Sequence, residues 1–363
     1  MKRIISKRNS RRSLARWSCA LAAIAIVAGV IHAQGMSRWK KLAPCPVPLQ
    51  ELLGASANGK MYVFAGLEGQ GSPGVVWEYD PGTDAWTVKR PMPLPAHHVA
   101  FTEYQNKIYA FGGFKKYDGP LTGTGPIWEP IDNAWEYDPK TDTWKTLAPM
   151  SGKRGSASAA VVNGKIYVVG GAALPPNSKS PAMIKGPGPN TTAQFSVGTV
   201  QEYDIATNTW RDRSPMHVAR NHFIVGAVNG KIYAIGGRVN TIFNTGANTD
   251  AVEEYDPPTD MWNSVKMKMP TPRSGVAGGV YNGRIFVAGG EVEDTRMNGS
   301  FRAVEAYDPA ADEWTVMPPM LIARHGLAGA VVGDTLHMVG GALASGSPGD
   351  SKDHEALRLS DYK

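Results

Sequence analysis

The sequence is poor in cysteine, with only Cys19 and Cys45 among 363 residues. Cys19 lies in an N-terminal leader and is expected to leave with it. Cys45 would then be alone, and a single cysteine cannot form an internal disulfide. The scarcity of cysteine therefore excludes a disulfide-stabilised domain.

Long apolar runs are also lacking at the N-terminus. The apolar stretch "CALAAIAIVAGVI" has thirteen residues, 19–31, whereas a membrane span needs about 20. A basic stretch precedes it and Ala33 follows as a cleavage residue, which predicts a secretory signal over residues 1–33. An uncleaved anchor is the alternative. Within the leader, "SRRSLAR" (residues 10–16) resembles a twin-arginine export motif. We expect a periplasmic or secreted protein that meets the membrane only through this signal.

Excess positive charge is absent from the rest of the chain. The formal net charge is +6, but seven of the 38 basic residues lie in residues 1–33, which contain no acid. The remainder has 31 basic against 32 acidic residues. The chain after the leader therefore has almost no net charge and no overall positive potential that would attract nucleic acid. We expect no nucleic-acid partner.

Internal repetition is what the sequence has in abundance. Each unit contains a run of small residues, an Asn-Gly hairpin signal, an apolar strand ending in Gly-Gly, and a Tyr-Asp turn before a tryptophan, as in "NGKIYVVGG" and "EYDPKTDTW". Periods of about 50 residues with four short strands are typical of β-propeller blades. The recurring tryptophans, expected to be structural, are Trp86, Trp144, Trp210, Trp262 and Trp314.

These motifs resemble the Kelch repeat family. The resemblance runs from Trp39 nearly to the C-terminus and implies an all-β, six-bladed Kelch β-propeller. The sixth unit reaches the C-terminus without a tryptophan, while "SRWKKLA" near the N-terminus has a tryptophan with no unit before it. We therefore predict that the N-terminal segment is the outermost strand of the last blade, with Trp39 as a structural clasp. The predicted propeller spans 37–363, with blades at approximately 47–90, 94–148, 152–214, 218–266, 271–318, and 322–363 plus 37–42.

Strand parity predicts where a ligand would bind. The loops between the second and third strands of each blade (b–c loops) are long, variable and rich in Pro and Gly. They lie on the face where the innermost strand (strand a) starts, and long loops on a rigid ring usually carry binding. Near the channel on this face, the equivalent positions are Leu49, Ala96, Arg154, Arg220, Arg273 and Arg324.

Four consecutive blades thus place arginine at the channel entrance. Arginine suits bidentate recognition of carboxylate or phosphate, which predicts an anionic ligand. The alternative is that these arginines bond neighbouring loop carbonyls or acids. The residues predicted to bind the ligand are Arg154, Arg220, Arg273, Arg324, His98, His222 and His325.

Two enzymatic alternatives follow from resemblance. Kelch-type copper oxidases would need a Cys–Tyr crosslink, but Cys45 lies at the start of the ring, and neighbouring His97 and His98 would point to opposite faces of a strand. We expect no metal and no cofactor. The chain is also distantly similar to the N-acetylneuraminate epimerase (mutarotase) group. In that group the catalytic Glu follows the fourth Gly pair, where this chain has Arg238; here Glu291 follows the fifth pair, with Arg296 and Arg302 later in the loop.

The sequence therefore predicts a monomeric, exported binding propeller whose partner is an unknown protein or an anionic glycan or sugar acid. The alternative is a sugar-acid mutarotase or epimerase with Glu291 as its catalytic base.

Overall fold

The computed structural model describes residues 38–67, 72–119, 128–175, 178, 195–240, 247–293, 297–346 and 349–362. The leader, Arg296 and parts of the b–c loops lie outside this range, so the export prediction is not addressed by it. The part of the chain that the structure describes contains no helix that could span a bilayer.

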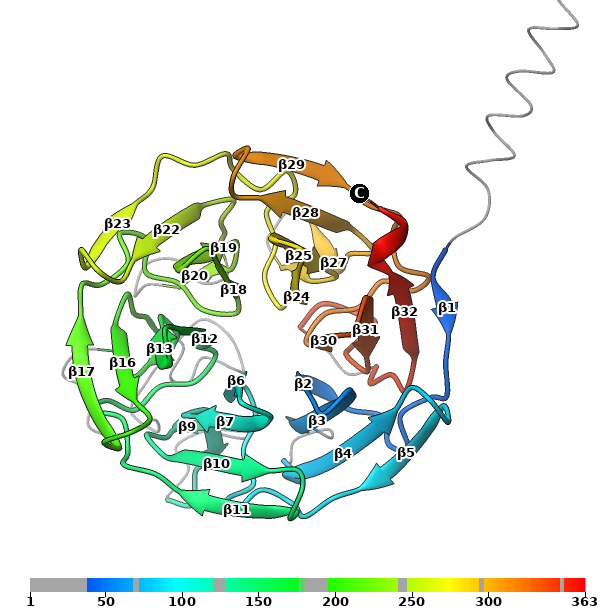
Figure 1. Ribbon diagram of the computed structural model, residues 1–363, viewed down its shortest axis with the longest axis horizontal. Helices are drawn as coiled ribbons and strands as arrows, with labels where there is room; N and C mark the ends of the chain where they lie inside the picture. The colour runs from blue at the N-terminus through cyan, green and yellow to red at the C-terminus, as the bar shows by residue number, and fades with distance from the viewer. Residues whose placement is uncertain are drawn as a thin grey trace, which may run out of the picture. The chain divides into compact units, whose positions relative to one another are not determined.

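Residues 39–363 form one compact unit, a ring of six four-stranded antiparallel sheets (Figure 1). Blades 1 to 3 comprise β2 (Gln50–Ala57), β3 (Lys60–Leu67), β4 (Val75–Asp80) and β5 (Ala85–Val88); β6 (Ala100–Tyr104), β7 (Lys107–Phe111), β10 (Ala134–Asp138) and β11 (Thr143–Thr146); and β12 (Ser158–Val162), β13 (Lys165–Val169), β16 (Val200–Asp204) and β17 (Thr209–Arg213).

Blades 4 to 6 repeat this arrangement. Their strands are β18 (Ile224–Val228), β19 (Lys231–Ile235), β22 (Val252–Asp256) and β23 (Met261–Asn263); β24 (Ala277–Tyr281), β25 (Arg284–Ala288), β28 (Val304–Asp308) and β29 (Glu313–Val316); and β30 (Ala328–Val332), β31 (Thr335–Val339), β32 (His354–Arg358) and β1 (Lys40–Lys41). A 3-10 turn, η2 (Leu359–Asp361), follows β32.

The N-terminal strand closes the ring, as predicted. β1 pairs antiparallel with β32, with Lys40 opposite Ala356 and Lys41 opposite Glu355, and the two lie side by side in Figure 1. Closure gives the last blade four strands like the other five and covers the outer edge of β32, which could otherwise pair with other chains. The prediction of an all-β six-bladed propeller is confirmed.

The tryptophans join each blade to the one before it. Each indole Nε1 donates to a backbone carbonyl of the preceding blade, at 2.8–3.1 Å: Trp86 to Ala43, Trp144 to Arg90, Trp210 to Ala148, Trp262 to Ser214, Trp314 to Met267 and Trp39 to Pro318. The bond from Trp39 follows the same rule as the other five. The N-terminal segment therefore takes the place of the sixth blade's own outer strand in packing as well as in pairing.

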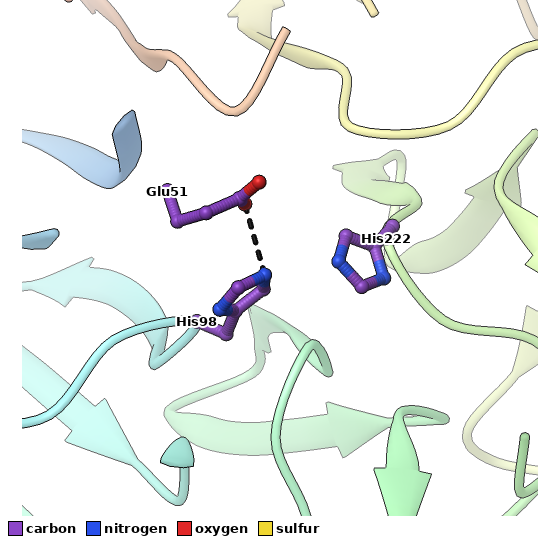
Figure 2. A group of neighbouring side chains, drawn as sticks. All are labelled: Glu51, His98 and His222. Atoms are coloured by element: carbon purple, nitrogen blue, oxygen red, sulfur yellow. Dashed lines mark ion pairs between the residues drawn. The ribbon is translucent and has the colours of Figure 1, made fainter. Parts of the chain in front are cut away.

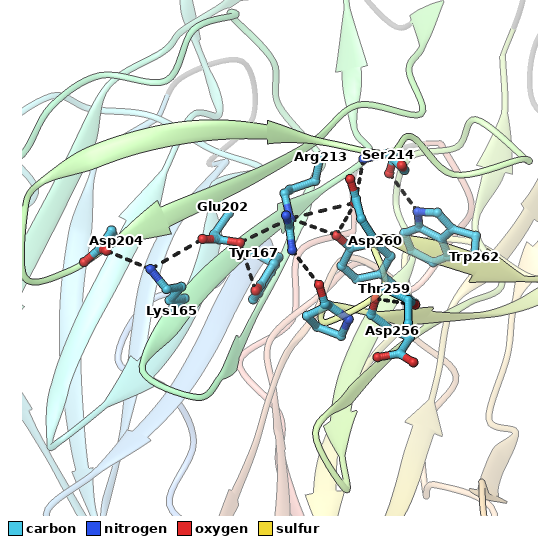
Figure 3. A network of polar contacts seen from close by, with 12 residues as sticks. Lys165, Tyr167, Glu202, Asp204, Arg213, Ser214, Asp256, Thr259, Asp260 and Trp262 are labelled. Carbon is cyan, nitrogen blue, oxygen red and sulfur yellow. Dashed lines mark hydrogen bonds and ion pairs between the residues drawn. The ribbon is translucent and has the colours of Figure 1, made fainter.

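Figure 3 shows one of these junctions, between blades 3 and 4. Arg213 lies 3.2 Å from Glu202 of its own blade and donates to the hydroxyl of Tyr255 in the next blade at 3.1 Å. Tyr255 in turn donates to Asp260 at 2.6 Å, and the same carboxylate oxygen accepts the backbone N–H of Ser214. Polar contacts thus fix the angle between blades that the aromatic packing holds together.

The innermost strands, which surround the channel, are β2, β6, β12, β18, β24 and β30, each in contact with its neighbours around the ring. Small residues permit this close approach: a Cβ on Gly54 would lie 2.6 Å from the carbonyl oxygen of Gly329. In blades 2 to 5 the b–c loops begin and end as short hairpins on one face. These are β8 (Phe114–Lys116) with β9 (Trp128–Pro130), β14 (Ala172–Ala173) with β15 (Phe195–Ser196), β20 (Arg238–Val239) with β21 (Ala247–Asn248), and β26 (Glu291–Glu293) with β27 (Asn298–Ser300).

Candidate functional site

The four arginines of the predicted entrance are buried inside the blades. Each lies just before strand a and turns its side chain toward the third strand of its own blade, with 2% or less of the residue exposed. Arg220 pairs with Glu253 at 3.0 Å, Arg273 with Glu305 at 2.6 Å, and Arg324 with Glu355 at 3.1 Å. In blade 3, Arg154 donates to Gln201 at 2.7 Å.

This placement corrects the expectation of an arginine-lined entrance. Backbone carbonyls accept further hydrogen bonds from the arginines, as when Arg273 donates to the carbonyls of Gly289 and Val287. Burial lowers the pKa of Arg220 to about 10, with Glu253 acting in the opposite direction, so the side chain stays charged at neutral pH. A buried charge must be paired, and these partners supply the pairing. The arginines therefore hold strands together, as in the alternative interpretation.

The channel is instead surrounded by residues two positions further along the chain, which we call the inner ring: Glu51, His98, Ser156, His222, Gly275 and Gly326. All six have positive φ, between 51° and 63°. Backbone bonds link them around the channel: Ser156 N–H donates to His98, His222 to Ser156, Gly275 to His222, and Gly326 to Gly275, at 2.9–3.1 Å.

Four inner-ring residues have this left-handed backbone although they are not glycine. A left-handed conformation costs a residue with a Cβ about 1–3 kcal/mol and recurs at functional sites, where the surroundings enforce it. Here it aims the side chains of Glu51, His98 and His222 toward one another (Figure 2). Their ligating atoms lie within 4.8 Å of one another. His98 Nε2 lies 3.0 Å from a carboxylate oxygen of Glu51.

A second group of ionisable residues adjoins the inner ring. Glu291, at the start of β26, contacts Arg238, at the start of β20, through a guanidinium nitrogen. Its other oxygen accepts from Ser345 Oγ and Gly346 N–H, both at 2.9 Å, and lies 3.3 Å from His325 Nε2. The same His325 nitrogen lies 3.9 Å from Glu51. We call Glu51, His98, His222, Arg238, Glu291 and His325 together the channel cluster.

Burial and mutual contact set the protonation states of two members. Burial would raise the pKa of Glu51, but His98, His222 and His325 outweigh burial and hold it well below its usual range. Burial, together with nearby Arg238 and His98, holds the pKa of His222 well below its usual range. At neutral pH the site therefore combines a carboxylate with a neutral imidazole, which suits proton transfer and metal ligation.

The structure brings together four of the predicted site residues, His98, His222, His325 and Glu291. Glu51 was missed because its blade has Leu49 where blades 3 to 6 have arginine. A signal was available: counting two residues past each equivalent position gives Glu51, His98 and His222 in one register. Arg238 was noted only as a departure from the family pattern. Arg302, expected near the site, donates to the carbonyl of Met320.

Cys45 has no place in this site. It is buried among apolar residues that include Leu49, Leu52 and Val339. Burial raises the pKa of its thiol to about 11. A protonated, enclosed thiol is neither a ready nucleophile nor a ready ligand.

The sequence comparisons place Kelch repeats along the chain. Residues 31–171 match the family described as "KLHDC2/KLHL20/DRC7 Kelch-repeats domain", and residues 153–217, 219–266 and 272–321 match families described as "Kelch motif". Beta-scruin of Limulus polyphemus is 31% identical over 216 residues, which cover 59% of this chain and 22% of beta-scruin. Kelch-like protein terF of Aspergillus terreus is 28% identical over 222 residues, 61% of this chain and 45% of that protein. The chain thus matches less than half the length of these relatives.

Among solved structures, that of YjhT superposes with a TM-score of 0.67 at 19% identity, covering 86% of this chain and 95% of that one. At this identity the likeness concerns the fold. Motif register, the closed ring of six blades and the sequence matches agree: the chain belongs to the Kelch repeat β-propeller family.

Proposed function

We propose that this propeller binds a small carbohydrate, of the sugar or sugar-acid class, at the centre of its b–c loop face. The observation that carries the proposal is the convergence of the channel cluster, to which blades 1, 2, 4, 5 and 6 each contribute an ionisable side chain. Carboxylates accept hydrogen bonds from hydroxyl groups, and Arg238 offers donors to a ligand carboxylate. A site with few, fixed polar groups at the mouth of a rigid ring is typical of small-ligand binding.

Arg238 is arranged to meet such a ligand. Its Nε and one terminal nitrogen bond Ser274, and that same terminal nitrogen contacts Glu291. The other terminal nitrogen takes part in none of the hydrogen bonds among the described residues. With 12% of its side chain exposed, Arg238 keeps one edge of its guanidinium for a partner.

A sugar-acid mutarotase is the second candidate, and the pairing of carboxylate with imidazole favours it. Mutarotation opens the ring when a base removes the proton of the anomeric hydroxyl group and an acid protonates the ring oxygen as its bond to the anomeric carbon breaks; closure on the other face reverses both transfers. Glu291 with His325, and Glu51 with His98, each place a base and an acid within 3.3 Å. The departure from the epimerase group, in which the Glu belongs to the fourth blade, still separates this chain from that pattern.

Binding is tested by saturation-transfer NMR on untagged protein with N-acetylneuraminate and, separately, with a neutral hexose. The wild type is expected to show saturable transfer with at least one of them. Glu51→Gln and Glu291→Gln should weaken it at least tenfold, whereas Lys268→Ala, at a lysine with 72% of its side chain exposed, should not. Unchanged binding in both glutamine variants would move the site elsewhere.

Catalysis is tested by following the α-to-β conversion of N-acetylneuraminate by NMR with and without enzyme. The second candidate predicts acceleration over buffer that Glu291→Gln removes even at substrate concentrations that saturate its weakened site. Saturable binding without acceleration would leave a binding protein and reject the isomerase.

We also propose that the chain is exported, on the strength of the leader alone. Expression in a bacterium with a periplasm should yield periplasmic protein whose intact mass corresponds to cleavage after Ala33. A cytoplasmic, full-length product would contradict export.

A further inference from the structure

Within the channel cluster, Glu51, His98 and His222 are arranged differently from the other members. They come from three different blades and occupy the equivalent inner-ring position in each, and each has φ between 53° and 55°. In Figure 2 a ring nitrogen of each imidazole and the carboxylate of Glu51 lie close to one another. Repeating blades bring these residues together although the sequence keeps them far apart.

The hydrogen bonds behind His222 determine which of its nitrogens carries the proton. Ser196 Oγ donates to the carbonyl of Arg238 and accepts from Asn221 Nδ2 at 2.8 Å and from the Asn240 N–H. The amide of Asn221 is therefore oriented with Oδ1 toward His222 Nδ1, at 2.5 Å. His222 Nδ1 must donate this bond, which leaves the lone pair of Nε2 directed at Glu51 and His98.

The environment of His98 allows the same state. Its Nδ1 contacts Nδ1 of His97, so one proton lies between these two nitrogens and can belong to either ring. His97 is 1% exposed and packs against Phe114. When the proton is on His98 Nδ1, Nε2 of His98 also presents a lone pair to the centre. Outer partners that orient ligand imidazoles in this way accompany most histidine metal sites.

We propose that Glu51, His98 and His222 bind a divalent transition-metal ion of the zinc class. Two imidazole nitrogens and one carboxylate are a donor set of catalytic zinc sites, which keep a further position open. Ligand atoms of a tetrahedral zinc lie about 3.4 Å from one another; here one pair is 3.0 Å apart and all lie within 4.8 Å, so small side-chain rotations suffice.

The charges of the channel cluster agree with a bound cation. The channel cluster has two carboxyl groups, Glu51 and Glu291, against one guanidinium, Arg238, and the bond to Asn221 leaves Nε2 of His222 as the nitrogen that can bind a cation. A divalent ion would reverse this balance and favour an anionic or hydroxyl oxygen at its open position, beside Glu291 and His325. Metal binding by these three residues does not require that oxygen to belong to a sugar.

The experiment uses untagged protein dialysed against a chelator and titrated with Zn²⁺ by calorimetry, in the absence of any sugar. We expect one saturable site per chain, and Co²⁺ in its place should give the absorption bands of a four- or five-coordinate ion. Glu51→Gln and His222→Gln should each weaken Zn²⁺ binding more than a hundredfold. Asn221→Ala, which removes an outer partner, should cost about 10–100-fold.

His217→Gln is the matched control, since this histidine has 59% of its side chain exposed and lies outside the cluster; it should bind Zn²⁺ like the wild type. The titration of the wild-type protein with Zn²⁺ tests the proposal without any variant, because absence of a saturable site overturns it. Equal binding in wild type and His222→Gln would also overturn it. Sugar binding is measured separately with and without Zn²⁺, so the two proposals can fail independently.

Discussion

At the residue scale, the four buried arginines are accompanied by matched partners. The arginines of blades 3 to 6 are Arg154, Arg220, Arg273 and Arg324. The third strand of each of these blades has a polar partner two residues before the position of the tyrosine in the Tyr-Asp turn. These partners are Gln201, Glu253, Glu305 and Glu355. Blades 1 and 2, with Leu49 and Ala96, have Trp77 and Trp135 there instead. The space inside each blade is therefore filled either by an ion or hydrogen-bonded pair or by a large apolar ring.

This pairing predicts how blade 4 responds to substitution. Arg220→Leu should lower the free energy of unfolding by about 3–5 kcal/mol, because it leaves the carboxylate of Glu253 buried and unpaired. Adding Glu253→Gln should restore part of the loss, since the uncompensated charge is then gone. Chemical denaturation of the single and double variants measures both values. Additive losses would contradict a role for the pair.

The prediction that the four arginines line the channel entrance was wrong because residue type alone does not determine what an arginine binds. An arginine near a channel mouth can serve a ligand or a buried acid, and only its partner decides which. That partner lies on another strand, yet its identity covaries with arginine from blade to blade, so comparison of the six units could have found it. The direction of Glu51 was harder to foresee, since it depends on a positive φ that no turn motif in the sequence signals.

At the element scale, the turn between the third and fourth strands couples each blade to its predecessor. In blade 2, Asp142 accepts from the hydroxyl of Tyr137 at 2.7 Å and from the backbone N–H of Arg90, in blade 1, at 2.9 Å. Blade 3 has Asn208 in this role, bonded to Tyr203 and to the N–H of Ala148. A side-chain oxygen, not a charge, is what the turn requires.

Asp142→Ala should therefore cost about 1–3 kcal/mol of unfolding free energy, from two lost bonds and because alanine tolerates φ 53° less well than aspartate. Asp142→Asn should cost less than about 0.5 kcal/mol, since asparagine keeps the oxygen and tolerates positive φ. Asp142→Gly removes the backbone strain but does not restore the two hydrogen bonds. Its loss of unfolding free energy should lie between those of the alanine and asparagine variants. A glycine variant as stable as wild type would show that the bonds contribute nothing.

At the scale of the whole molecule, ring closure depends on a short strand. β1 has only two residues, so Trp39 supplies most of the burial that holds this segment: it is 4% exposed and donates to Pro318 at 2.8 Å. The fold was predictable to this level because each blade repeats the same registers. The hairpins of the b–c loops were not, because no register repeats there.

Trp39→Ala should lower the free energy of unfolding by about 3–5 kcal/mol and expose the closing segment. Trypsin should then cleave at Arg38, Lys40 or Lys41 before the rest of the folded ring is digested. Trp210→Ala removes an equivalent indole from the junction between blades 2 and 3, far along the chain from the closing segment, and should not direct cleavage to this segment. Equal protection of the segment in wild type and Trp39→Ala would argue against the clasp.

The closing blade also makes the ring sensitive to acid. Burial lowers the pKa of His337 to about 4 and that of His354 to about 3, so the folded protein binds fewer protons than the unfolded chain below the ordinary histidine pKa of about 6.5. Stability should be full above that pH and decline as the pH falls toward 4, by a few kcal/mol in all.

Melting temperatures between pH 7 and pH 4 measure this decline. Replacing both histidines with glutamine should flatten the curve without making it level, because the buried His97 and His222 titrate in the same direction. A double variant with the wild-type slope would show that the acid sensitivity arises elsewhere.

The central claim is that the working site lies at the channel centre, on the channel cluster rather than on the four arginines. The most direct measurement is a crystal structure of untagged protein grown with Zn²⁺ and N-acetylneuraminate, with an anomalous difference map at the zinc edge. We predict a strong peak between the carboxylate of Glu51 and the Nε2 atoms of His98 and His222, with ligand density beside Glu291 and Arg238. Zinc and ligand bound elsewhere, with the channel cluster unchanged, would contradict the account.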